Sequence, residues 1–155
     1  MLLRKLDYEP GIAPCLNNLA SVRVKRSDYA GAERNAREAL EIFKTIGNDL
    51  GVAASLAELG KAAMAQKEFE PARSYLEQSL ALCRQLDEKV GILGSLQSLG
   101  KLMMLQNDYE SARVFYQETL DLASELDAAP YVTTAMGALE ALNHTGPGDA
   151  MEVGA

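Results

Sequence analysis

The sequence predicts an all-α protein, built as a solenoid of stacked antiparallel helical hairpins. Segments beginning at Gly11, Gly51 and Gly91 repeat with a period of 40 residues, and self-similarity at a fixed period is typical of repeat architectures. Within each segment the apolar residues recur in steps of three and four, which places them on one face of a helix. The alternation of apolar and polar residues that a strand would show is absent.

Corresponding positions of the three units carry the same kind of residue. Leucine columns, an aromatic column and an alanine column run through all of them, and some continue beyond residue 130. These columns are Leu16, Leu56, Leu96 and Met136; Leu19, Leu59, Leu99 and Leu139; Tyr29, Phe69 and Tyr109; Ala32, Ala72 and Ala112; Leu40, Leu80 and Leu120; and Ile46, Leu86 and Leu126.

Each unit is predicted to contain a helix A and a helix B, joined by a short polar turn. The spacing predicts A helices near residues 11–25, 50–65 and 90–105, B helices near 29–46, 69–86 and 109–126, and a further A helix at 130–142. One hairpin leaves its own apolar face exposed, whereas stacked hairpins cover each other.

Several residues fit the expected helix starts and contacts. Asp28 and Asp108 precede B helices and are expected to accept otherwise unpaired backbone N–H groups. Pro71 falls in a first turn, where its missing N–H costs nothing, and Pro130 stands where a helix begins. Gly60 and Gly100 interrupt A helices, and we expect them, with Ala20, to allow close approach of helix B at the column Ala32, Ala72 and Ala112.

The two ends of the chain read as incomplete units. Residues 2–8 match the end of a B helix eighty residues later, and Leu2, Leu3 and Leu6 are expected to cover the first hairpin as a partial cap. We therefore expect a half unit at 1–10, full units at 11–50, 51–90 and 91–130, a capping or truncated helix at 131–142, and a flexible tail at 143–155. A start in mid-repeat favours a piece of a longer array over a minimal solenoid.

Composition excludes several classes of function. Fifteen basic against 22 acidic residues give a net charge of −7, which argues against nucleic-acid binding, because that requires cationic surface. Cys15, Cys83 and His144 are too few for a zinc site, and we expect the cysteines to act as small hydrophobes in a reducing compartment. No secretory or membrane-spanning segment is evident, so a cytoplasmic location without membrane contact is expected.

Catalysis is not expected, and no cofactor is implied. The lone histidine lies in a polar, glycine-rich tail, whereas an enzyme needs a positioned nucleophile and base. The carboxylates Glu33, Glu38 and Glu41 belong to a solvated helix face. No phosphate-binding or dinucleotide-binding glycine loop is present.

The third unit carries a recognisable motif, which resembles the tetratricopeptide repeat. The chain resembles its long variant of about forty residues, because Lys44, Arg84 and Ser124 stand where the shorter form has a late proline, whereas Arg23 departs from a position that is usually bulky and uncharged. Such repeats are similar to those of kinesin light chains, of a spindle adaptor and of MalT-type regulators. The resemblance implies a right-handed superhelix whose A helices line a peptide-binding groove. The motif residues are Leu99, Gly100, Met103, Tyr109, Ala112, Tyr116 and Leu120.

The resemblance also implies which side chains line that groove. Lys61 and Lys101 occupy the same place in consecutive units and would stand about 10 Å apart, where they could hold a carboxylate; alternatively both are solvated, or Lys61 pairs with Glu58. Packing in the core is the alternative for Met64 and Met104. The implied groove residues are Asn17, Asn18, Ser21, Glu58, Lys61, Met64, Gln97, Ser98, Lys101 and Met104, with Lys25, Thr134 and Ala138 beside them.

Three functions remain open from the sequence. The first is a non-catalytic interaction module that binds a peptide or partner segment in the groove. The second is a sensor or regulatory segment of a larger signalling protein or transcriptional regulator. The third is a structural scaffold that forms homo-oligomers through the solenoid ends.

Overall fold

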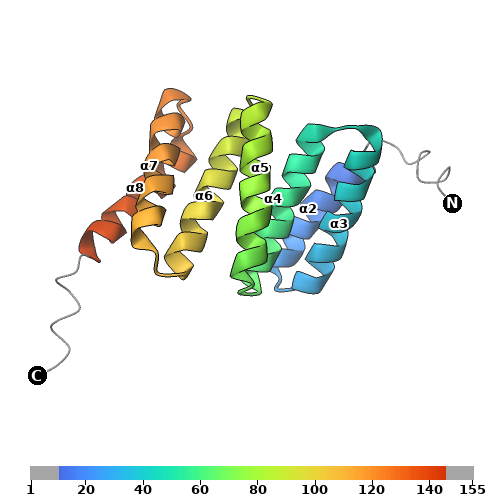
Figure 1. Cartoon of the computed structure of the whole chain (residues 1–155), viewed down its shortest axis with the longest axis horizontal. Coiled ribbons are helices and arrows are strands. Elements are labelled where there is room, and N and C mark those ends of the chain that lie inside the picture. Colours follow the sequence, from blue (N-terminus) through green and yellow to red (C-terminus); the bar gives the residue numbers. More distant parts are fainter. Residues whose placement is uncertain (1–10, 146–155) are drawn as a thin grey trace, which may run out of the picture. The chain divides into compact units, whose positions relative to one another are not determined.

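A computed structural model describes residues 11–145 of the chain. The described residues form seven helices and no strand, so the all-α fold class is confirmed (Figure 1). The helices are α2 (Ile12–Lys25), α3 (Tyr29–Ile46), α4 (Asp49–Ala65), α5 (Phe69–Gln85), α6 (Lys89–Leu105), α7 (Tyr109–Glu125) and α8 (Ala129–His144). Most bounds lie within one residue of the prediction, and the expected partial cap at Leu2, Leu3 and Leu6 lies outside the described residues.

The helix starts follow from their first residues. Asp28 Oδ1 accepts the Gly31 N–H at 3.0 Å, and Asp108 Oδ1 accepts the Ser111 N–H at 3.1 Å, which confirms both predicted caps. Asn48 caps α4 in the same way, a role that the sequence reading missed. Pro130 lies in the first turn of α8, where no helical hydrogen bond to its nitrogen is needed.

The helix ends follow from one left-handed residue in every turn. Positive φ angles recur every 20 residues, in a range from 52° to 70°. A single left-handed residue stops the helix and reverses the chain, and aspartate and asparagine tolerate this conformation better than most residues. The six residues are Ser27, Gly47, Lys67, Asp87, Asn107 and Asp127.

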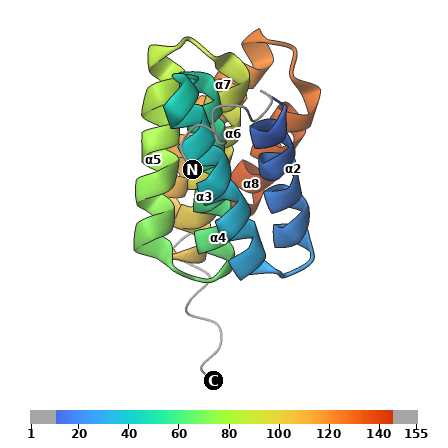
Figure 2. The same ribbon diagram turned by 90° about the vertical axis from the view of Figure 1, so that its right-hand side faces the viewer.

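The chain divides into two compact units between Ser95 and Leu96, inside α6, and each unit is described by itself. In unit 1, α4 packs against α2, α3 and α5, and α3 also packs against α2. In the view of Figure 2, α2 and α5 lie at opposite margins of this unit. In unit 2, α7 packs against α8.

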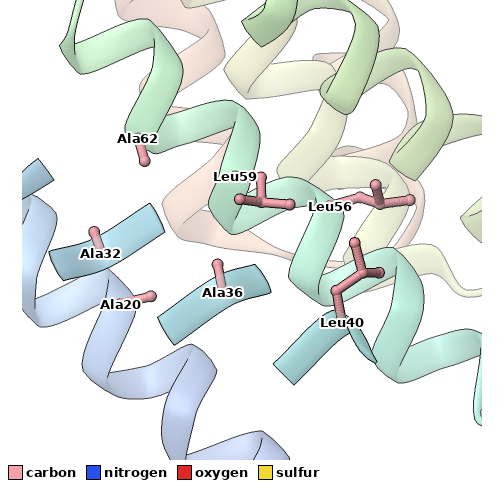
Figure 3. Close-up of a cluster of buried hydrophobic side chains, with 7 residues drawn as sticks. All are labelled: Ala20, Ala32, Ala36, Leu40, Leu56, Leu59 and Ala62. Carbon is pink, nitrogen blue, oxygen red and sulfur yellow. The ribbon is translucent and has the colours of Figure 1, made fainter. Parts of the chain in front are cut away.

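The core of unit 1 is built from alanines and leucines of three helices. Alanines of α2 and α3 face leucines of α4, and all are at most 8% exposed (Figure 3). A second cluster joins Ala13 to Ala39 and Phe43. Small residues at these columns let the helices approach closely, as the repeats predict. The first cluster consists of Ala20, Ala32, Ala36, Leu40, Leu56, Leu59 and Ala62.

Glycine is required where helix A meets helix B. A Cβ atom on Gly60 would lie 2.6 Å from Leu76 Cγ and 3.4 Å from the Ala72 carbonyl oxygen. A Cβ atom on Gly100 would lie 3.0 Å from the Tyr116 ring. The predicted close approach is therefore confirmed, although the ring of Tyr116, rather than backbone, faces Gly100.

Two predicted core positions are wrong at the first and last described helices. Leu19 is 43% exposed, whereas Leu59 in the same column is 1% exposed. Met136 of α8 is 56% exposed, and the positions that bury Ala53, Gly60 and Ala63 in α4 carry exposed polar residues in α8: Thr133, Glu140 and Asn143. Nothing among the described residues covers these positions, because coverage is supplied by a neighbouring helix and not by the column itself.

Candidate functional site

One accessible stripe runs along α4, which is otherwise buried. Its side chains follow each other in steps of three and four, so they share one face of the helix. The helices α2, α3 and α5 cover the other sides of α4. We call this set, together with the accessible residues in the same register of α2, the α2–α4 stripe: Asn18, Ser21, Lys25, Ala54, Ala57, Glu58, Lys61 and Ala65.

Small side chains make the α4 part of this stripe shallow. Ala54 is exposed, and Ala57 and Ala65 are half-buried. A partner segment can therefore approach the helix backbone closely at these positions. The sequence reading missed these alanines because it searched for polar groups; their spacing at i, i+3 and i+11 was the available signal.

A single ion pair lies within the stripe. Lys61 Nζ donates to Glu58 Oε1 at 2.7 Å, and the two side chains are 39% and 13% exposed. The i,i+3 pairing that the sequence offered as an alternative is thus present. The second oxygen, Glu58 Oε2, is buried without a hydrogen-bond donor.

Asn17 contributes to the fold rather than to an open surface. It is 8% exposed, and its Oδ1 accepts a hydrogen bond from the Ser55 hydroxyl at 3.1 Å. This buried bond ties α2 to α4. Its neighbour Asn18 is exposed and Ser21 is half-buried, so these two side chains of α2 offer hydrogen-bonding groups to a partner.

Met64 lies in the interior of unit 1 and is 8% exposed. Its packing matches the core alternative considered for it. In α6, Lys101 is exposed while Gln97, Ser98 and Met104 are half-buried. Lys101 and Lys61 belong to different units, so their expected separation stays a prediction.

The thiols differ in their surroundings. Cys83 is buried, and desolvation raises the pKa of its thiol, whereas Cys15 is exposed. The prediction that both cysteines behave as small hydrophobes is right for Cys83 and wrong for Cys15. Within residues 11–145, histidine, cysteine, aspartate and glutamate form no group of three able to hold a metal ion.

A shallow hollow lies on α5, away from the stripe. One helix alone lines it, with mixed charges: Glu70, Arg73, Ser74, Glu77, Gln78 and Ala81. Across the part of the chain that the structure describes, no helix is long and apolar enough to cross a membrane.

These hairpins, their repeating turns and their in-phase columns define a helical-repeat protein of the hairpin class. The family model of the tetratricopeptide repeat matches residues 11–85 and 51–125, so the chain belongs to the tetratricopeptide repeat family. Proteins of this family generally mediate protein–protein interaction, and they are generally not catalytic. A comparison with curated proteins found no match.

Among solved structures, the chain is similar to BtubC (BKLC) from P. vanneervenii. The TM-score is 0.63 with 18% sequence identity, over 85% of this chain and 62% of that chain. At this identity the likeness concerns the fold alone. The chain thus matches less than two thirds of that protein's length.

Proposed function

We propose that the protein is a non-catalytic interaction module that binds an extended segment of a partner protein along its A helices. In unit 1 the binding surface is the α2–α4 stripe. The observation that carries this proposal is the stripe itself: a row of small residues flanked by Asn18, Ser21, Glu58 and Lys61, on a helix whose other faces are packed.

The chemistry of the stripe suits a peptide backbone. The Asn18 side chain has both donors and an acceptor, and the Ser21 hydroxyl can act as either. Alanines beside them leave room for the backbone of an extended chain. The residues Gln97, Ser98, Lys101 and Met104 of α6 occupy the corresponding register and are proposed to continue the surface in unit 2.

Blocking the stripe tests this proposal. Ala54→Trp places a bulky ring on the stripe, and Ala81→Trp places the same ring on another exposed alanine of unit 1, in the α5 hollow. Partners should be captured by the wild-type chain and by Ala81→Trp, and lost with Ala54→Trp, with circular dichroism confirming that both variants are folded. Equal capture by all three chains would refute the proposed surface, and selective loss with Ala81→Trp would move it to α5.

A further inference from the structure

Glu58 Oε2 is a buried acceptor without a donor, and it lies on the proposed binding surface. Two other buried side-chain atoms lack partners, Arg23 Nε and Asn35 Nδ2. Neither belongs to the α2–α4 stripe. A buried oxygen without a donor is costly and calls for an explanation. Because this oxygen belongs to a stripe residue, a partner can supply what the chain itself does not.

The internal partner of Glu58 is a poor match for a carboxylate. Lys61 offers a point charge to Oε1 alone, at 2.7 Å, and partly exposed pairs of this kind contribute little to stability. A guanidinium presents two parallel N–H donors, which match both carboxylate oxygens at once. The terminal torsion of a glutamate is soft, so Oε2 can turn outward to meet such a group.

We propose that Glu58 is a subsite for a cationic side chain of the partner segment, preferentially an arginine, and that Lys61 occupies this subsite in the unbound protein. The inference rests on the proposed function, since it names the chemistry of a segment bound at the same stripe. Binding exchanges the Glu58–Lys61 pair for a bidentate pair with the partner and releases the Lys61 ammonium to solvent.

The surrounding charges are compatible with this exchange. Glu58 is the carboxylate of the stripe, and its other cation, Lys25, stands seven positions beyond the Asn18 register. Seven helical residues span about 10 Å, which is comparable to the screening length at physiological salt. The net charge of −7 over the whole chain attracts basic segments over longer distances.

Lys101 provides a matched control for Lys61. It stands at the same register of α6, but Ser98 occupies the place that Glu58 has in α4. Lys61→Met and Lys101→Met therefore change the net charge equally, while only the first releases a carboxylate. This separates the placeholder role of Lys61 from a general effect of charge.

The experiment uses the full chain, labelled with ¹⁵N, and blocked heptapeptides Gly-Ser-Gly-X-Gly-Ser-Gly in which X is arginine, citrulline or aspartate. We expect amide shifts around Glu58 with the arginine peptide, weaker shifts with citrulline, and none with aspartate. Lys61→Met should tighten arginine-peptide binding severalfold, Lys101→Met should not, and Glu58→Gln should abolish it.

Three results would overturn the inference. They are weaker arginine-peptide binding in Lys61→Met, preference for the aspartate peptide, or absence of arginine-dependent shifts around Glu58. Each is distinct from failure of the proposed function, which the Ala54→Trp capture experiment decides. If that variant loses its partners while Lys61→Met also weakens binding, the stripe is the binding surface and Lys61, not Glu58, recognises the partner.

Discussion

Replacing Gly60 with alanine probes the contact between helix A and helix B. The new Cβ atom would lie 2.6 Å from Leu76 Cγ and 2.8 Å from Leu76 Cδ2, so one of the groups must move by close to an ångström. Leu76 is fully buried, and such overpacking costs roughly 1–3 kcal/mol. Alanine in place of glycine within a helix returns about 0.5–1 kcal/mol, so the expected net loss of stability is about 1 kcal/mol.

Gly137→Ala is the matched control. Gly137 also lies inside a helix, α8, but a Cβ atom there meets nothing within 4 Å. The control should gain about 0.5–1 kcal/mol. Urea unfolding followed by circular dichroism measures both free energies of unfolding, and their difference reports the cost of overpacking.

The double variant Gly60→Ala/Leu76→Ala identifies the clashing partner. Truncating Leu76 gives the new methyl group room, so the two substitutions should couple favourably by about 1–3 kcal/mol. Equal stabilisation by Gly60→Ala and Gly137→Ala, with no coupling to Leu76, would refute the assignment of Gly60 to a close helix contact.

Four further predictions follow from other contacts. Gly100→Leu should destabilise the chain by about 1–3 kcal/mol, because Tyr116 already lies 3.0 Å from the Cβ position; unchanged thermal unfolding would contradict this. Lys67→Gly should raise the free energy of unfolding by about 0.5–1 kcal/mol, since a left-handed lysine is strained, and a loss in urea unfolding would count against it. The Gly31 N–H, then Arg23, hold the pKa of Asp28 below its ordinary 3.8, so its stabilisation is present above pH 3.8 and lost as pH falls through the lower folded value; Asp28→Asn should lack this acid sensitivity in pH-dependent unfolding. Cys15 should react rapidly with a thiol reagent and Cys83 only on unfolding, and equal rates in the folded chain would contradict that.

Local signals in the sequence predicted the helices because the causes of helix starts and ends are themselves local. Asp28 and Asp108 cap helices by bonding N–H groups three residues ahead, and proline at a helix start needs no distant partner. Asn48 acts in the same way and was missed only because its turn lacked the aspartate of the others. Recurrence every 40 residues made these local signals mutually consistent.

The candidate site was predicted less well, because it depends on what neighbouring helices cover. Asn17 and Asn18 are adjacent in sequence and equally polar, yet Asn17 is buried against Ser55 while Asn18 is exposed. Lys61 reads as a free cation until the structure brings it to Glu58. The alanines of the α2–α4 stripe carry no chemical signal of their own.

By itself, the sequence determined the helical-hairpin repeat, its period and its family, since these depend on the order of residues along one chain. Only the tertiary structure decided which faces are covered. Leu19 and Leu59 share one column, but α2 and α3 pack against Leu59, whereas no described helix packs on Leu19. Burial is a property of neighbours, and the position of a neighbour is not written in the residue that it covers.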